Sequence, residues 1–427
     1  MESTCLITPG HPSKNPRLVK EADALTQAGY DVHVIAGDYH PWGHKADAQF
    51  RGRPWSLDRV SYGAVANPLR RAYVGGRKRV AEMLARGVST RGREINLRAH
   101  HWIVPELVNR ARSVSADLFM AHYPPALPAA LRAAEEQNAA VGFDAEDFHR
   151  GQFTDEKSEG LDAQLTRWFE ETYVPQCDYV TAASPGIGEA YADVLGIEVP
   201  TTVLNVFPRS ERSGHTPESE LRDEHPGEGL SLYWYSQTIG PARGLEMVVR
   251  AMGAVRRRTA DAPRLTLSLR GSWAGDYEDE LRSCARSVGL DRTQIRHLDR
   301  APPDQLIERA AQHDIGLALE QAASRNRDAC ITNKMFAYLL AGCPVLATDT
   351  AGQRWVHEHV PDAVALCPVG DVDAMAERLR TWGQSAEKRR QAAEAARRAG
   401  DERFNWEVEK KALLSVVRSV LGQRDQP

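Results

Sequence analysis

The sequence lacks an excess of basic residues: 54 lysines and arginines stand against 58 aspartates and glutamates, a net charge of −4. A dedicated nucleic-acid-binding protein usually carries a basic excess, so no nucleic-acid partner is expected. Lysine is scarce, with 9 residues against 45 arginines. Such a bias reflects the base composition of the genome and not the function of the protein, so a single arginine says little about function.

The six cysteines are isolated at positions 5, 177, 284, 330, 343 and 367. Their spacing excludes a disulfide scaffold, fits a reducing cytoplasm and gives no sign of a structural zinc site. No apolar run approaches the roughly 20 residues of a membrane span. The first residues lead into a strand-like segment and not into a signal peptide. These absences predict a soluble cytoplasmic protein.

No period of 20–50 residues repeats, which excludes solenoids and propellers. Instead, short apolar runs alternate with amphipathic helical stretches through most of the 427 residues. This alternation predicts parallel sheets covered by helices on both faces, in an α/β fold with two doubly wound Rossmann-like domains facing a cleft. We expect an N-terminal domain at 1–207, a polar linker at 208–229, a C-terminal domain at 230–403 and a final helix at 404–427.

Five sequence motifs occur in an order and spacing that resemble those of retaining GT-B glycosyltransferases of family four. They are Asn15-Pro16-Arg17 with Glu21-Ala22 and Ala28–Val32, Val141–Asp147, Ser236–Gly244, Thr332–Phe336 with Leu340–Val345, and Asn405-Trp406-Glu407. The resemblance covers nearly the whole chain. It implies the GT-B fold, with the last helix crossing back to the N-terminal domain. It also implies metal-independent transfer of a sugar from a nucleotide-sugar donor to an acceptor hydroxyl, with no cofactor.

The donor's diphosphate would be bound by the C-terminal domain. Gly240 and Gly244 would bring backbone N–H groups close to the phosphates, and Arg243 stands where the family usually has a lysine. A helix beginning near Asn333 would direct its dipole at the same charge, with Thr332 and Lys334 beside it.

One departure concerns the ribose of the donor. The family usually places a glutamate after the Asn-Lys motif, where this sequence has Ala337. The nearest remaining carboxylates, Glu320 and Asp328, are candidates for contacts with the donor sugar. Ala337 leaves full activity in question.

Candidate catalytic residues of the N-terminal domain follow the ends of two expected strands. His122 ends one, and Glu146 and Asp147 follow the other. A histidine at this position lines the bound sugars in the family, and the carboxylates would bind or orient the acceptor hydroxyl. Arg17 and His149 are candidates for contacts with the acceptor.

A basic stretch at Arg70–Arg98 contains nine basic residues, against about four expected from the chain's average. Apolar residues interleave with them, so the stretch could lie at an anionic membrane surface, which would add peripheral contact at the inner face of the membrane. A solvated helix, or a pocket for an anionic soluble acceptor, would show the same pattern.

Two other functions stay open at this stage. One is a glycosyltransferase-like scaffold protein with weak or no activity, and the other is a sugar-nucleotide epimerase of the same fold. A Rossmann dehydrogenase is disfavoured because no Gly-x-Gly-x-x-Gly follows the first strand. The acceptor is left open as a glycan, a lipid-linked sugar or a small molecule.

Overall fold

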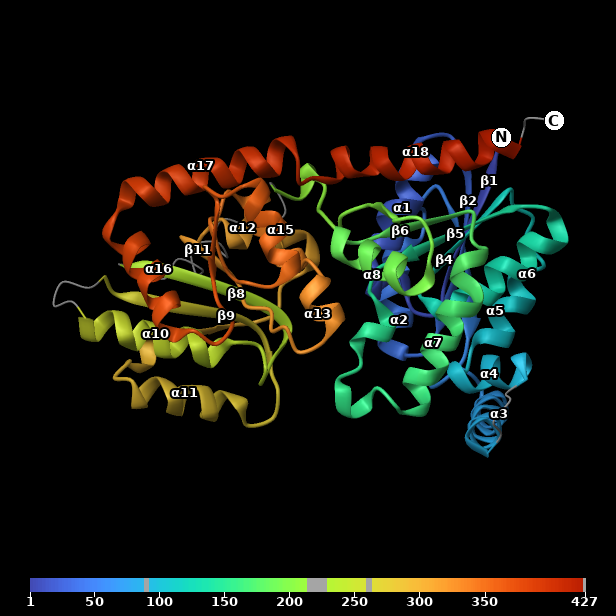
Figure 1. Ribbon diagram of the computed structural model, residues 1–427, viewed down its shortest axis with the longest axis horizontal. Coiled ribbons are helices and arrows are strands. Elements are labelled where there is room, and N and C mark those ends of the chain that lie inside the picture. The colour runs from blue at the N-terminus through green and yellow to red at the C-terminus, as the bar shows by residue number, and fades with distance from the viewer. Residues whose placement is uncertain (88–91, 213–228, 259–262, 425–427) are drawn as a thin grey trace. The chain divides into compact units, whose positions relative to one another are not determined.

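The computed structural model describes residues 1–87, 92–212, 229–258 and 263–424, which form two compact units (Figure 1). Unit 1 contains Met1–Val203 and the chain from Lys410 onward, and unit 2 contains Leu204–Glu409. The sequence had placed the corresponding boundaries at 207 and 403. Most of the expected linker, residues 213–228, lies outside the described residues. Both units are parallel α/β structures, which confirms the expected fold class.

The described residues of unit 1 form a seven-stranded parallel sheet in the order β3-β2-β1-β4-β5-β6-β7. Its central strands are short and almost wholly buried, as expected for a sheet covered on both faces. The strands are β1 (Ser3–Thr8), β2 (Asp31–Asp38), β3 (Ser56–Ser61), β4 (Leu118–His122), β5 (Ala140–Ala145), β6 (Tyr179–Ala182) and β7 (Thr201–Thr202).

Helices cover both faces of this sheet (Figure 1): Arg17 of α1 contacts Asp144 on one face, whereas Tyr191 of α8 packs against Phe143 on the other, the face that α6 and α7 cover. The side chain of Asn15 accepts a hydrogen bond from the backbone of Leu18 and starts the first helix, in which Pro16 fills the first position. The helices are α1 (Pro16–Gln27), α2 (Pro41–Ala46), α3 (Pro68–Gly87), α4 (Arg93–His100), α5 (Val104–Ala111), α6 (Leu127–Gln137), α7 (Leu161–Tyr173) and α8 (Pro185–Leu195).

The described residues of unit 2 form a six-stranded parallel sheet in the order β10-β9-β8-β11-β12-β13. Its apolar core gathers side chains from β8, β9, β11 and the helices α10, α11 and α16. The strands are β8 (Leu230–Ile239), β9 (Leu265–Trp273), β10 (Ile295–Leu298), β11 (Ile315–Ala318), β12 (Val345–Thr348) and β13 (Val364–Cys367).

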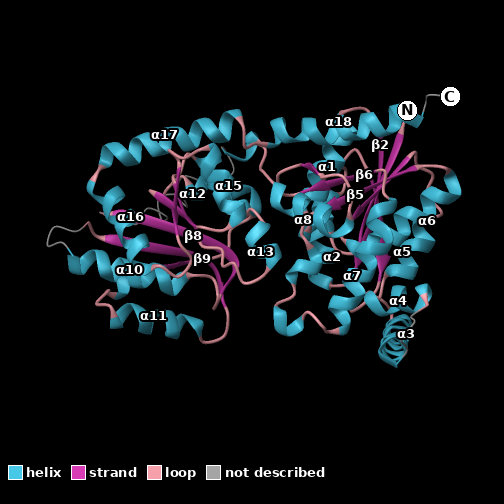
Figure 2. Cartoon of the chain, in the orientation of Figure 1, coloured by secondary structure: helices cyan, strands magenta, loops and turns pink. Residues whose placement is uncertain are grey.

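The helices of unit 2 again lie on both sides of the sheet, with α10 and α11 opposite α12 and α17 (Figure 2). They are α10 (Leu245–Arg258), α11 (Tyr277–Ser287), α12 (Leu306–Ala310), α13 (Arg325–Ala329), α14 (Asn333–Ala341), α15 (Ala351–His359), α16 (Val372–Gln384), α17 (Ala386–Glu402) and the start of α18 (Trp406–Arg424).

The last helix, α18, belongs to both units, as the expected cross-over helix would. It begins in unit 2, and from Lys410 onward it packs with unit 1, where Lys410 Nζ donates to Gln27 Oε1 at 3.2 Å. Among the described residues, no helix combines the length and the apolar character needed to span a bilayer.

Each sheet reverses its strand order beside its first strand, between β1 and β4 in unit 1 and between β8 and β11 in unit 2. Loops leave such a point in opposite directions and open a crevice at the carboxyl ends of the strands, where ligands bind in folds of this kind. The candidate residues of unit 2, together with Arg17 and His122 of unit 1, lie at or after these strands, and Glu146, Asp147 and His149 follow the neighbouring strand β5.

Candidate active site

In unit 2, the loop after β8 packs directly against the end of β11. Gly244 has φ of 74°, and a Cβ there would lie 2.8 Å from the Gln321 side chain and 3.0 Å from Leu319 Cβ. Glycine is therefore required both by the backbone conformation and by the close approach. The loop that contains Gly240 and Arg243 is thus held beside the residues that follow β11.

A charged group lies at the start of α14, next to this loop. Lys334 Nζ is 3.3 Å from Glu320 Oε1 and 3.3 Å from Thr332 Oγ1, and it lies over the Trp234 ring. Burial opposes the charge on Glu320, but the Lys334 ammonium outweighs burial and lowers the pKa of this carboxyl. Thr332, Lys334 and Glu320, which the sequence had grouped around the donor, are brought together.

Two further features make this edge of unit 2 suited to an anion. The helix α14 has no acidic residue in its first turn and no side chain capping its N-terminus, where Thr332 and Asn333 lie. The N–H of Met335 donates to the Thr332 backbone oxygen at 3.1 Å, which leaves the N–H groups of Asn333 and Lys334 for a ligand. Arg243 is half-buried and has no hydrogen bond or ion pair within the described residues. Together these groups can bind a diphosphate and stabilise its charge as it leaves.

The remaining candidates of unit 2 have other surroundings. Asp328 accepts a hydrogen bond from the Ala351 backbone at 3.0 Å and so stabilises the start of α15. Ala337 is fully buried in an apolar cluster with Ile307 and Leu340. The position where the family has its ribose carboxylate therefore belongs to the core in this chain.

In unit 1, a buried arginine joins three segments of the chain. Arg17 is 1% exposed, and its guanidinium binds both carboxylate oxygens of Asp144, with Nε to Oδ2 at 2.5 Å and the terminal nitrogen to Oδ1 at 2.7 Å. It also donates to the backbone oxygen of Val203. The pKa of Asp144 is lowered, because the charge of Arg17 and hydrogen bonds outweigh burial. The arginine expected to contact the acceptor thus stabilises the fold of unit 1.

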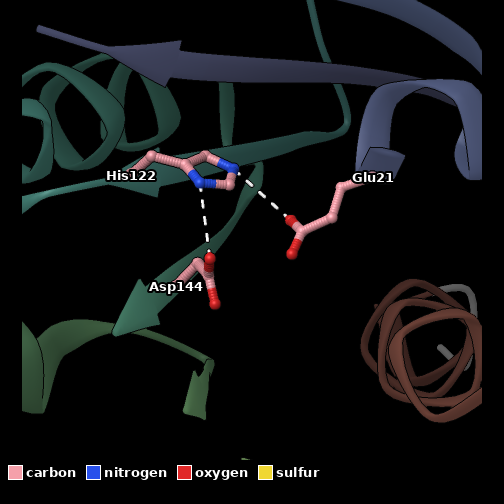
Figure 3. A group of neighbouring side chains, drawn as sticks. All are labelled: Glu21, His122 and Asp144. Carbon is pink, nitrogen blue, oxygen red and sulfur yellow. Dashed lines mark ion pairs between the residues drawn. The ribbon is translucent and has the colours of Figure 1, made fainter. Parts of the chain in front are cut away.

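His122, at the end of β4, lies between two buried carboxylates (Figure 3). Its Nε2 is 3.4 Å from Glu21 Oε2, and its Nδ1 is 3.4 Å from Asp144 Oδ2 and 3.2 Å from Glu146 Oε1. Burial alone would lower the pKa of His122, but the charge of Glu21 and the hydrogen bonds to the carboxylates raise it well above its ordinary value. The surrounding carboxylates therefore favour the protonated imidazole.

Glu21, His122 and Asp144 also offer ligand atoms that lie within 4.8 Å of one another. A divalent cation fits this group poorly, because Arg17 binds both oxygens of Asp144 and lies 3.3 Å from Glu21 Oε1. The guanidinium of Arg17 and the imidazole of His122 already supply positive charge to Asp144 and Glu21.

Glu146 connects this buried cluster with the surface, since its side chain is 12% exposed. Asn15 Nδ2 donates to Glu146 Oε1 at 2.5 Å, which orients the carboxylate. Asp147 is half-buried, and its backbone oxygen accepts a hydrogen bond from the Tyr191 hydroxyl. His149 is buried with its ring 5.7 Å from that of Tyr123.

A cavity of about 730 Å³ opens at the same edge of the unit 1 sheet, and we call it the head cavity. Tyr123 lines it and has φ of 67°, a conformation that costs a residue with a side chain about 1–3 kcal/mol. Such strain persists where the surroundings enforce it and is concentrated at functional sites. Tyr123, Glu21 and Asp144 were not among the predicted site residues, although Glu21 and Asp144 lie within two of the five motifs.

We expect the free energy of unfolding to fall as the pH rises above 6.5, the ordinary pKa of histidine. The pKa of His122 is raised in the folded chain, so above pH 6.5 the folded chain retains a proton that the unfolded chain releases. Burial also raises the pKa of Glu21, which acts in the same direction from its ordinary value of 4.5 upward. Each such proton contributes a slope of at most about 1.4 kcal/mol per pH unit. Urea unfolding followed by tryptophan fluorescence from about pH 6 to 9 should show this slope.

The His122→Gln variant is the control, because glutamine does not titrate. Its stability should depend less on pH over the same range. An equal slope in both proteins would show that His122 is not protonated in the folded chain.

The comparisons with known proteins agree with this geometry. Residues 250–415 match the family described as Glycosyl transferase-like. The search of curated proteins gave no match. Among solved structures, the Anabaena HepE protein in complex with UDP is similar, with 16% identity, a TM-score of 0.69, and coverage of 98% of this chain and 100% of that one. Sucrose-phosphate synthase from Thermosynechococcus elongatus shares 15% identity with a TM-score of 0.70, over 99% of this chain and 100% of that one.

A UDP-forming α,α-trehalose-phosphate synthase from Burkholderia vietnamiensis shares 13% identity with a TM-score of 0.65, and 98% of this chain and 100% of that one are covered. At these identities the likeness to solved structures establishes the fold. For residues 250–415 the family match adds a similarity in sequence. The expected GT-B fold is confirmed, and residues 250–415 are similar to the family described as Glycosyl transferase-like.

Proposed function

We propose that the chain is a retaining glycosyltransferase that moves a sugar from a nucleotide-sugar donor to an acceptor hydroxyl. The observation that carries the proposal is the anion site at the switch point of unit 2. There the tight loop at Gly244, the cation of Lys334 and the free N-terminus of α14 adjoin one another. HepE, of similar fold, has been crystallised with UDP and with UDP-glucose. UDP is therefore the first nucleotide to test.

The reaction we propose needs no resident metal or cofactor. The leaving diphosphate would be stabilised by Arg243, Lys334 and the backbone N–H groups near Gly240 and Gly244. As the family resemblance implies, the acceptor proton passes to a phosphate oxygen of the donor, so that no protein base is required. Glu320 remains our candidate for the donor sugar, because it lies beside Lys334 and is half-buried. Asp328 is a weaker candidate, since it already stabilises α15.

In unit 1 we propose that some candidate residues contact the acceptor and that others position those residues. Glu146 is partly exposed and can orient a sugar hydroxyl, with Asp147 beside it. His122 and Arg17 are buried behind Glu146 and act as positioning residues. His149 acts through its contact with Tyr123, which lines the head cavity.

Calorimetric titration with UDP, GDP and dTDP tests the proposal. We expect one of them to bind, and the corresponding sugar nucleotide to be consumed with release of nucleoside diphosphate. If none binds at millimolar concentration, the donor assignment is wrong. Conversion of the sugar nucleotide into a product of the same mass would identify an epimerase. Binding of the nucleotide without any turnover would favour a scaffold protein.

We also propose peripheral contact with a membrane through α3, the described part of the basic stretch together with Arg93–Arg98. This helix exposes Leu69 and Met83 with relative accessibilities of 85% and 71%. Six of its residues are lysine or arginine and only Glu82 is acidic. An exposed apolar stripe beside basic side chains is suited to an anionic lipid surface. The cytoplasmic location stays a prediction from the sequence.

The chain should therefore sediment with vesicles containing phosphatidylglycerol and not with phosphatidylcholine vesicles. Binding should weaken between low and high salt, because the electrostatic part is screened. Leu69→Ser should reduce sedimentation, whereas Val199→Ser, which alters an exposed valine outside α3, should not. Equal binding to both vesicle types would contradict this proposal.

A further inference from the structure

Three hollows on unit 1 adjoin one another in a row, each sharing lining residues with the next. The head cavity shares Ala64, Arg71 and Trp102 with a second cavity of about 600 Å³, which we call the basic cavity. The basic cavity in turn shares Ala72 and Gly76 with a third hollow of about 540 Å³, which we call the apolar groove. A single elongated ligand can therefore occupy all three.

The head cavity has the lining of a sugar site. Tyr39, Tyr62, Trp102 and Tyr123 present aromatic surface, and no aspartate or glutamate is among its described lining residues. Lys14 lies over the Tyr39 ring and donates to its hydroxyl at 3.1 Å. Aromatic faces combined with a few polar groups are typical of sites for ring-shaped polar ligands.

The basic cavity carries positive charge without a counter-charge. Its only charged lining residues among those described are Arg71 and Arg79. Both are exposed, and neither is paired with a carboxylate in the described part of the chain. Two glycines, Gly75 and Gly76, leave open space on this side of α3. Arginine pairs bind phosphate oxygens by charge-assisted hydrogen bonds, so the cavity is suited to a phosphate group.

The apolar groove lies between α3 and α4. It is lined by Tyr73, Val80, Leu84 and Ile95, and the first three are 67%, 58% and 47% exposed. Arg77 and Arg98 flank it. Exposed aliphatic side chains in a groove favour a hydrocarbon occupant, because covering them removes apolar surface from water.

From this order of sugar-like, anionic and apolar linings, we infer that the acceptor is a lipid-linked saccharide joined through phosphate. The saccharide occupies the head cavity, the phosphate lies between Arg71 and Arg79, and the lipid chain lies along the apolar groove. The inference rests on the proposed function and narrows its acceptor. It differs from the membrane contact of Leu69 and Met83, which lie outside the groove lining.

Monomeric decyl phosphate, kept below its micelle concentration, is the probe for calorimetric titration. We expect it to bind more tightly than methyl phosphate, which lacks the tail, and than decyl maltoside, which lacks the charge. Arg71→Ala and Arg79→Ala should each weaken decyl phosphate binding by about tenfold or more. Leu84→Glu should abolish the advantage of the decyl chain. Arg86→Ala, on α3 but outside all three linings, and Val199→Ser should leave binding unchanged.

Three results would overturn the inference: methyl phosphate binding as tightly as decyl phosphate, decyl maltoside binding equally well, or no binding of the monomer by a protein that still binds vesicles. UDP titrated into the same preparation tests the proposed function separately from the lipid-linked acceptor. Binding of UDP without binding of decyl phosphate would remove the lipid-linked acceptor and leave the proposed function intact. Failure of UDP to bind would count against the proposed function itself.

Discussion

Replacing Arg17 with methionine should lower the free energy of unfolding by about 3–5 kcal/mol. The arginine is buried and binds both oxygens of Asp144, and it lies 3.3 Å from Glu21. Methionine preserves much of the volume but leaves two buried carboxylates with only His122 to balance them. Removing one partner of a buried charge pair costs more than the pair itself contributes, because the remaining charge stays desolvated. Urea unfolding at neutral pH measures the effect.

Arg112→Met is the matched control. Arg112 pairs with Glu136, but the two side chains are 50% and 44% exposed, so the loss of stability should be far smaller than for Arg17→Met. Arg17→Lys should fall between the two, because lysine retains the charge and lacks the planar fork. If Arg17→Met and Arg112→Met destabilised the chain equally, the buried cluster would not depend on the guanidinium.

Replacing Lys334 with alanine should weaken UDP binding by about 10- to 150-fold, the loss of one charge-assisted contact worth about 1.5–3 kcal/mol. Arg243→Ala should have a similar effect. Arg243→Lys should lose less, because it retains the charge without the bidentate fork. Arg390→Ala, which removes an exposed charge from α17, controls for the change in net charge. Titration calorimetry with UDP gives the affinities.

If Lys334 and Arg243 contact the same phosphates, the two variants should be non-additive. The loss of UDP affinity in the double variant should differ from the sum of the losses in the single variants. Thermal unfolding of each variant must stay close to that of the parent chain. Unchanged affinity in Arg243→Ala, or a loss that follows a drop in stability, would contradict the assignment of the loop at Gly244 to phosphate binding.

The fold could be predicted from the sequence because buried parallel strands are short apolar runs, as β1, β4 and β11 show. The edge strands β3 and β7 could not, because their residues are largely polar and only partly buried. The helical pattern of the sequence over 371–400 predicts one helix, but the structure has two there. Ser385 ends α16 and caps α17 by accepting a hydrogen bond from the Lys388 backbone.

Site residues that lie within a sequence motif could be predicted. Roles that depend on tertiary packing could not. Lys334 and Thr332 follow from the Asn-Lys motif, and the structure adds their contact with Glu320. For Arg17 the motif indicated its place after β1, but its burial depends on Asp144 from a strand more than a hundred residues away. A carboxylate four residues after Arg17, at Glu21, was the available local sign of a buried charge cluster.

A crystal structure of the full chain with UDP tests the central claim most directly. The account predicts that the diphosphate lies between the loop at Gly240–Gly244 and the N-terminus of α14, with Lys334 Nζ and the Arg243 guanidinium on its oxygens. UDP bound elsewhere on the chain, or a diphosphate that contacts neither side chain, would contradict it.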